Sequence, residues 1–243
     1  MTAAALSWEA QVFSALATVF DPELDQPVTE LGFVRSVTID DEGVEVHLRL
    51  PTSFCAPNFA YLMVSDAYEV LAELPDVGRI QVLLDDHHDS AKINGGVAAG
   101  AGYLGTFGVE AEQNLDELRR TFQRKAHLAA VERCCRAMLA GGVWTLEELP
   151  MLELFDLPEG RLKSALLRRR EAIGLPTGSH ARVLVDHIGR PAGTPDTALW
   201  LRLAAATRIS IEGNAHFCRG LLATRYADPA GAAPVVVNTR SRS

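Results

Sequence analysis

The sequence predicts an α+β protein in which a small α/β layer domain is followed by a mostly helical second domain. Residues 33–39 and 44–50 alternate apolar and polar side chains around a DDEG turn, a pattern typical of a β-hairpin. Helical periodicity flanks this hairpin, and residues 110–140 contain good helix formers and no proline. The length of 243 residues is sufficient for two such domains.

The expected elements of the first domain are a helix, the hairpin, a second helix and a third strand. Residues 7–19 form an amphipathic pattern with Ser7 as the expected N-cap, and the prolines of DPELDQP end that helix. Residues 57–74 place apolar side chains on one stripe of a helix. PDVGRIQVLL then reads as a turn followed by a strand. This order predicts a layer structure with helices on one side of the sheet.

The glycine content and the charge distribution predict the domain limits. Six glycines in residues 94–108 favour a linker, so we expect a first domain at 1–92, a glycine-rich linker at 93–108, a helical domain at 109–228 and a loose tail at 229–243. Residues 1–92 contain sixteen acidic and four basic residues, whereas residues 93–243 contain fifteen and nineteen. Further helices are expected at 145–155, 158–173, 196–207 and 210–226.

Composition excludes several classes of protein. No apolar stretch is long enough to cross a bilayer, and the N-terminal residues lack the basic region of a signal peptide, so we expect a cytoplasmic protein without a membrane partner. Four cysteines in a chain of this size are expected to be reduced thiols. The acidic first domain would repel phosphate backbones, and nucleic acid is therefore not an expected partner.

Cys55 is the residue on which chemistry is expected. It lies in PTSFCAP, a loop between a predicted strand and a predicted helix, where the first helical N–H groups and the helix dipole favour a thiolate. Thr52 offers a hydroxyl on the same loop. Carboxylates such as Asp21 and Glu23 would disfavour a bare thiolate, so their presence favours a metal role. A small cysteine buried beneath the turn is the alternative interpretation.

Two other groups of side chains contain metal-ligand types. DDHHD at 85–89 offers His87 and His88 at a strand end, although neighbouring side chains on a strand point to opposite faces. Glu212 and His216 are four residues apart on a predicted helix, with Cys218 close by. Solvated surface residues are the alternative in both cases. GAGYLG at 100–105 matches a dinucleotide pattern but lacks a directly preceding strand, which favours the linker interpretation.

One family resemblance covers about 75 residues of the first domain. The run DPEL, VTELGFVRSVTI, VEVHLRLPTSFCAPNFAYLM and LAELPDVGRIQVLL resembles the metal–sulfur cluster assembly factors, which include SufT-type, PaaD-type and cytosolic iron–sulfur targeting proteins. The chain departs from the family pattern in having Ser53 and Phe54 before the cysteine, Ala56 after it, and DDHHD at the strand end.

The resemblance implies a non-catalytic accessory protein that matures or inserts an iron–sulfur or other iron centre. It implies Cys55, Thr52, Asp21 and Glu23 as the site, and iron or an iron–sulfur cluster as a transient cofactor. A client metalloprotein or an assembly complex is the implied partner, with an iron-dependent monooxygenase as a client class, while a homodimer is left open. Two other functions remain open from the sequence: a thiol-dependent enzyme with Cys55 as nucleophile, and a metal-free adaptor.

Overall fold

The computed structural model describes residues 6–111, 115–191, 196–227 and 233–241. Contacts divide the chain into two compact units: unit 1 contains residues 1–115 and 214–243, and unit 2 contains residues 116–213. The helix α7 (Thr197–Tyr226) contributes residues to both units, with the division after Gly213. The expected α+β class is confirmed, with an α/β part followed by a mostly helical part.

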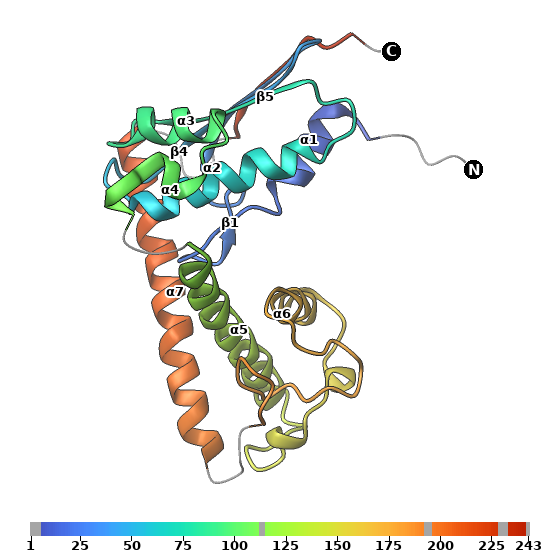
Figure 1. Cartoon of the computed structure of the whole chain (residues 1–243). Coiled ribbons are helices and arrows are strands. Elements are labelled where there is room, and N and C mark those ends of the chain that lie inside the picture. Colours follow the sequence, from blue (N-terminus) through green and yellow to red (C-terminus); the bar gives the residue numbers. More distant parts are fainter. Residues whose placement is uncertain (1–5, 112–114, 192–195, 228–232, 242–243) are drawn as a thin grey trace, which may run out of the picture. The chain divides into compact units, whose positions relative to one another are not determined.

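Unit 1 consists of short helices packed on a mixed sheet (Figure 1). Before α7, its elements in chain order are α1 (Trp8–Leu16), β1 (Phe20–Asp21), β2 (Gln26–Pro27), β3 (Val34–Ile39), β4 (Gly43–Arg49), α2 (Pro57–Ala72), β5 (Arg79–Asp85), α3 (Ser90–Ala98), α4 (Gly102–Phe107) and the 3-10 turn η1 (Gly108–Glu110). A last strand, β6 (Val235–Asn238), follows α7. The helix–hairpin–helix–strand order predicted for the first domain is therefore present.

The four-stranded sheet has the order β5–β4–β3–β6. The hairpin β3–β4 is antiparallel, and β5 and β6 each pair in parallel with one of its strands. At the hairpin tip, Asp40 accepts hydrogen bonds from the N–H groups of Glu42 and Gly43, each at 2.9 Å. Gly43 is required there, because a Cβ atom would lie 1.8 Å from the carbonyl oxygen of Arg79.

The core of unit 1 lies between the sheet and its helices. The helix α2 packs against β5, α1 and α3. Ser7 caps α1 as expected, accepting a hydrogen bond from the N–H of Ala10 at 3.3 Å. The alternating apolar residues of the hairpin point into the core, including the buried Val37, Ile39, Val44, Val46 and Leu48.

The expected glycine-rich linker at 93–108 is instead helical. Most of it lies in α3 and α4, and Ile93, Val97 and Phe107 are buried in the core of unit 1. Glycine permits this packing, because a Cβ atom on Gly96 would lie 2.0 Å from the hydroxyl oxygen of Thr106. The high glycine content thus reflects the close approach of two short helices rather than a linker.

The division of the chain also differs from the expected limits of 1–92, 109–228 and 229–243. The second half of α7 packs with the N-terminal residues, since Ala215 and Leu222 belong to the core of unit 1. Within the expected tail, residues 235–238 form β6 and pair with β3. Residues 228–232 and 242–243 lie outside the described residues.

Unit 2 is built from helices and 3-10 turns. It contains α5 (Leu115–Ala140) from Asp116 onward, η2 (Leu149–Met151), η3 (Leu154–Asp156), α6 (Arg161–Ala172) and the first half of α7. The helix expected at 145–155 consists of the two 3-10 turns and their connections. The helices expected at 196–207 and 210–226 are one continuous helix, and α7, at 30 residues, is the longest described. Glu132 binds Arg208 at 2.6 Å, and Arg133 binds Glu212 at 3.1 Å.

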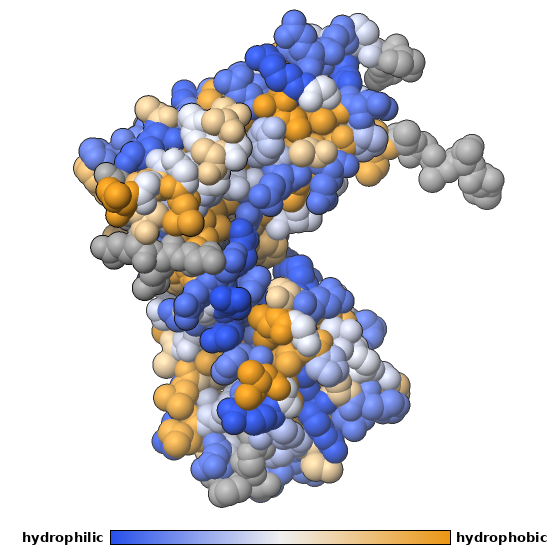
Figure 2. Space-filling model, viewed as in Figure 1, coloured by the Kyte–Doolittle hydropathy of each residue, from blue (hydrophilic) through white to orange (hydrophobic). Residues whose placement is uncertain are grey.

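On the surface, hydrophilic residues surround separate apolar areas on the face shown in Figure 2. Among the described residues, no helix has both the length and the apolar character needed to cross a membrane.

Unit 2 should lose stability in mild acid because His127 is 1% exposed. Burial, with the nearby charge of Arg170, lowers the pKa of His127 from 6.5 to about 4. Between pH 6.5 and about pH 4, the imidazole of His127 is therefore protonated in the unfolded chain but neutral in the folded chain. The contribution of His127 to the free energy of unfolding is fully present above pH 6.5 and is lost as the pH drops towards 4. We expect a loss on the order of 2–3 kcal/mol between pH 7 and pH 4.5 from this group.

Urea unfolding of the full chain, followed by circular dichroism across this pH range, measures the effect. The variant His127→Gln should weaken the pH dependence, whereas His216→Gln, at an exposed position of α7, should leave it unchanged. Equal pH dependence in all three proteins would contradict the assignment.

Candidate functional site

The acidic–proline turn between β1 and β2 is organised by Asp21. Its side chain accepts hydrogen bonds from the N–H groups of Glu23 and Leu24, each at 2.9 Å. Asp21 is only 7% exposed, and burial raises its pKa to about 6, although the two hydrogen bonds act in the opposite direction. Glu23 is partly exposed and accepts a hydrogen bond from Asn214 at 3.2 Å. Asp21 thus fixes the turn, while Glu23 contacts the second half of α7.

The loop that carries Cys55 runs from the end of β4 to the start of α2. Pro57 begins α2, so Cys55 lies just before the first helical turn, as the sequence predicted. Thr52 also lies as expected, with its hydroxyl oxygen 3.5 Å from the Cys55 sulfur. The same hydroxyl accepts a hydrogen bond from the N–H of Phe54 at 3.3 Å. The thiol is half-buried, whereas the neighbouring Phe54 is 80% exposed.

The DDHHD segment holds the Cys55 loop in place. The N–H of Asp89 donates to His87 Nδ1 at 3.1 Å, which leaves Nε2 as the protonated nitrogen. His87 Nε2 then donates to the carbonyl oxygen of Cys55 at 2.8 Å. The N–H of His88 donates to the Ser53 carbonyl at 2.9 Å, and its ring stacks on Phe54 with centroids 6.1 Å apart. Both imidazoles therefore support the loop.

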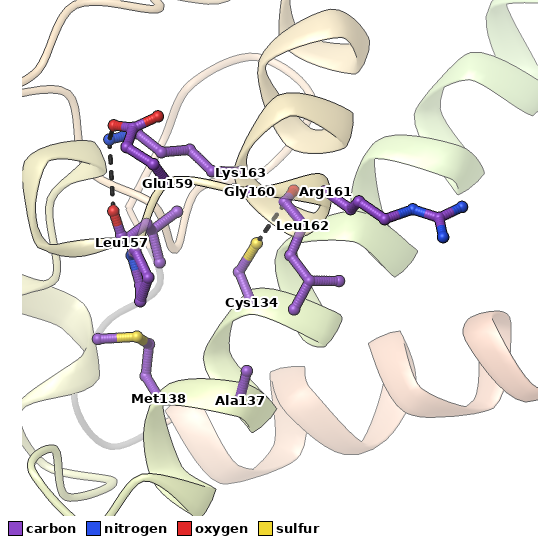
Figure 3. A pocket seen from close by; sticks show the side chains of 10 residues that line it. Cys134, Ala137, Met138, Leu157, Glu159, Gly160, Arg161, Leu162 and Lys163 are labelled. Atoms are coloured by element: carbon purple, nitrogen blue, oxygen red, sulfur yellow. Dashed lines mark hydrogen bonds and ion pairs between the residues drawn. The ribbon is translucent and has the colours of Figure 1, made fainter.

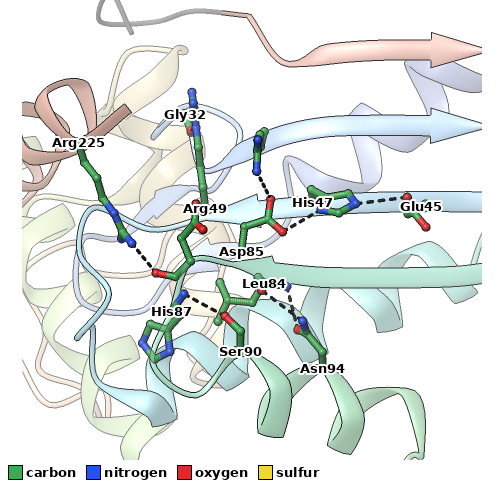
Figure 4. Close-up of polar contacts among 12 residues, drawn as sticks. Gly32, Glu45, His47, Arg49, Leu84, Asp85, His87, Ser90, Asn94 and Arg225 are labelled. Atoms are coloured by element: carbon green, nitrogen blue, oxygen red, sulfur yellow. Dashed lines mark hydrogen bonds and ion pairs between the residues drawn. The ribbon is translucent and has the colours of Figure 1, made fainter. Parts of the chain in front are cut away.

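Asp85 faces another set of residues (Figure 4). It binds Arg35 at 2.8 Å and His47 at 2.9 Å, and His47 also contacts Glu45 at 3.2 Å. Partial burial acts against protonation, but these two carboxylates raise the pKa of His47. Asp85, His87 and His88 thus have different partners. The described part of the chain contains no group of three or more His, Cys, Asp or Glu that could hold a metal ion.

Glu212 and His216, the other predicted metal ligands, also have different surroundings. Glu212 accepts hydrogen bonds from Arg133 at 3.1 Å and Arg208 at 2.7 Å within unit 2. Despite partial burial, these two guanidinium groups lower the pKa of Glu212. His216 is exposed on the part of α7 that belongs to unit 1.

Two of the other three cysteines are less accessible than Cys55. Cys134 and Cys135 are buried in α5, and burial raises their pKa values to about 11 and about 12. Cys134 donates weakly to the Leu162 carbonyl at 3.7 Å beside a largely apolar cavity of about 270 Å³ (Figure 3). Cys218 is half-buried on α7, and burial, followed by Asp21, Cys55 and Glu23, raises its pKa to about 11. No local pattern in the sequence indicates that Cys218 packs against the same core as Cys55.

Comparison with known proteins shows to which family this sequence is similar. The profile of the iron–sulfur cluster assembly proteins matches residues 9–82. The Fe–S protein maturation auxiliary factor YitW of Bacillus subtilis is 31% identical over 71 residues, which are 29% of this chain and 69% of YitW. An uncharacterized protein of Methanocaldococcus jannaschii is 32% identical over 84 residues, which are 34% of this chain and 86% of that protein. The chain belongs to the iron–sulfur cluster assembly protein family.

A third relative is a much longer protein. The iron–sulfur cluster carrier protein of Mycobacterium leprae is 33% identical over 82 residues, which are 33% of this chain but only 21% of the carrier. No solved structure matches the chain. The resemblance to assembly factors inferred from the sequence is confirmed for the first domain. The family segment ends within β5, before His87, His88 and the whole of α7.

Cys55 should be the first of the four thiols to be alkylated in the folded chain. A rise of the pKa from 9 to about 11 lowers the thiolate fraction of Cys134 or Cys218 about 100-fold at neutral pH. We therefore expect Cys55 to react at least about tenfold faster than the other three. A short iodoacetamide pulse at pH 7.5, followed by peptide mass mapping, ranks all four. In urea the four rates should converge, and a folded chain in which Cys55 is no faster would refute the ranking.

The variant Asp21→Asn should distinguish the effect of the two hydrogen bonds on stability from the effect of the negative charge. The amide oxygen can accept the same two hydrogen bonds, whereas Asp21→Ala loses both and should destabilise unit 1 by about 1–2 kcal/mol. A raised folded-state pKa means that the ionised form costs stability, which declines as the pH rises from about 4 through about 6. Asp21→Asn should therefore remove this decline.

Asp40→Asn is the matched control, because Asp40 accepts two backbone hydrogen bonds of the same length at the hairpin tip. Urea unfolding at pH 5 and pH 7.5 compares the variants. If Asp21→Asn were as unstable as Asp21→Ala at both pH values, the proposed role of the two hydrogen bonds in fixing the turn would be wrong.

Proposed function

We propose that this chain is a non-catalytic accessory protein that delivers or matures iron–sulfur centres in client proteins, with Cys55 as its functional thiol. The observation that carries the proposal is the construction of the Cys55 loop within a domain of the iron–sulfur cluster assembly family. The thiol is partly accessible, Thr52 lies beside its sulfur, and His87 holds its backbone. The relatives include a cluster carrier and a maturation factor.

A cluster would be the cargo of this site rather than a resident cofactor. Iron–sulfur clusters are usually held by four cysteine thiolates. Cys55 is the only cysteine in the family segment, and no described group of three or more ligands surrounds it. One chain therefore does not provide a complete coordination shell, and further ligands would come from the donor or the client. Transient binding of this kind is suited to a carrier.

The neighbouring histidine argues against a thiol-dependent enzyme as the alternative function. A nucleophilic cysteine is commonly activated by a base within hydrogen-bond reach of its sulfur. His87 uses Nδ1 to accept from the Asp89 N–H and Nε2 to donate to the Cys55 carbonyl. The imidazole thereby orients the loop and does not serve as that base.

The client class and the location form the finer part of the proposal. The likeness to PaaD-type factors favours an iron-dependent monooxygenase as one client. The four cysteines are free thiols, as proteins of the reducing cytoplasm usually contain. Asp21 and Glu23 would accompany Cys55 and Thr52 at the site.

Complementation of a deletion strain tests the proposal. Deletion of the gene in its own host should lower the activity of one or more iron–sulfur enzymes, or of an iron-dependent monooxygenase, without lowering the amount of polypeptide. The wild-type chain should restore that activity, and Cys55→Ala should leave it at the deletion level because the cargo thiol is lost.

Cys134→Ala is the control, since it removes a buried thiol of unit 2 and should complement fully. Unchanged metalloenzyme activities after deletion would refute the accessory function, and full complementation by Cys55→Ala would refute the role of the thiol.

A further inference from the structure

The second half of α7 lies along the acidic–proline turn of unit 1. Asn214 donates to the Glu23 side chain at 3.2 Å, and Arg219 donates to the Gln26 side chain at 2.6 Å. Glu23 belongs to the turn that Asp21 organises, and Gln26 begins β2 directly after it. These hydrogen bonds hold α7 on both sides of Cys218, because Asn214 is four residues before it and Arg219 is one residue after it.

The end of α7 is fixed to the Cys55 loop and to the segment that supports it. Arg225 donates to the carbonyl oxygen of Leu50 at 3.0 Å and also to that of Asp86. Leu50 begins the loop that leads to Cys55, and Asp86 precedes the histidine that binds the Cys55 carbonyl. The guanidinium groups of Arg49 and Arg225 lie 5.0 and 5.2 Å from the Tyr226 ring centre. These contacts bring α7 beside the loop.

Cys218 lies on the side of α7 that packs on unit 1. Ala215 and Leu222, three residues before and four residues after it, are buried in the unit 1 core, and these spacings share one helix face. Cys218 and Cys55 both pack against this core. Burial raises the pKa of the Cys218 thiol, and the charges of Asp21, Cys55 and Glu23 act in the same direction. The helix thus brings a second thiol to a site where the family segment has one.

We propose that Cys55 and Cys218 together form a two-thiolate site for a thiophilic metal ion or an iron–sulfur cluster carried as cargo. This inference rests on the proposed function and adds a second ligand to it. Soft metal centres select thiolates, and two thiolates occupy half of a four-coordinate shell. The other positions would remain for ligands from the donor or the client.

The charges around the pair favour a cation. Asn214 of α7 contacts Glu23 in the turn that Asp21 organises, so a cation held by the two thiolates would also be attracted by these carboxylates. When a divalent ion binds, two S–H bonds are replaced by two metal–sulfur bonds, and two protons pass to solvent. No oxidant or reductant is needed for this exchange.

Cadmium titration of the full reduced chain tests the site without a client or a cluster. Cd²⁺ alone should bind once per chain and produce an ultraviolet thiolate-to-metal absorption band. Cys218→Ser and Cys55→Ser should each reduce the affinity at least about tenfold and halve the band. Cys134→Ser is the control and should bind as the wild type does. Wild-type binding by Cys218→Ser would overturn the inference.

Thiol crosslinking of the wild-type chain provides a measurement that does not depend on how variants fold. Dibromobimane becomes fluorescent when it joins two thiols, and peptide mapping should identify Cys55 and Cys218 as the joined pair. Crosslinks confined to Cys134 and Cys135, or none at all, would count against the pair.

The two proposals can fail separately. If Cys55→Ala abolishes client maturation but Cys218→Ser leaves Cd²⁺ binding unchanged, the accessory function stands and the two-thiolate site does not. If both cysteines are required for Cd²⁺ binding but deletion changes no metalloenzyme, the site stands and the proposed function does not.

Discussion

The parallel pairing of β4 and β5 is the constraint on which the Cys55 site depends. Parallel neighbours place their carboxyl ends at the same edge of a sheet, and Arg49 is paired directly with Asp85. The loop after β4 and the segment after β5 therefore leave the sheet side by side. The hydrogen bond from His87 to the Cys55 carbonyl, and that from His88 to Ser53, follow from this register. The helix α2 makes the required crossover and begins where the Cys55 loop ends.

Two groups of unit 1, the carboxyl of Asp21 and the thiol of Cys218, are disfavoured in their charged forms. A buried carboxyl group such as Asp21 tends to take up a proton, and its two backbone hydrogen bonds only partly oppose this tendency. The thiol of Cys218 is subject to both burial and nearby negative charge. A site with these properties is poorly suited to a bare thiolate nucleophile and better suited to a positively charged ligand, which would stabilise the ionised forms together.

The parts of the fold that could be predicted from the sequence are those that depend on a local pattern of apolar and polar residues. Alternation identified the hairpin, and the position of Pro57 and the apolar stripe after it identified α2 and hence the place of Cys55. The glycine-rich helices were missed because Gly96 is explained only by its contact with Thr106, which composition cannot reveal. The separation within DDHHD does not come from alternation, because β5 ends at Asp85 and the later residues leave the sheet, where His87 has other partners than Asp85. The position of α7 depends on pairs such as Asn214 with Glu23, which no local pattern encodes.

The match to the family profile covers only part of the residues around Cys55. Asp21, Thr52 and Cys55 lie inside residues 9–82, so the turn and the thiol belong to the shared part. His87, which fixes the loop, and Cys218, which supplies the second thiol, lie outside it. A single cysteine in the family segment can contribute only one ligand to a soft metal. In the proposed site, the second half of α7 supplies a second thiol from the same chain. Hydrogen bonds from α7 to Gln26 and to the carbonyl of Leu50 hold this helix against the family segment.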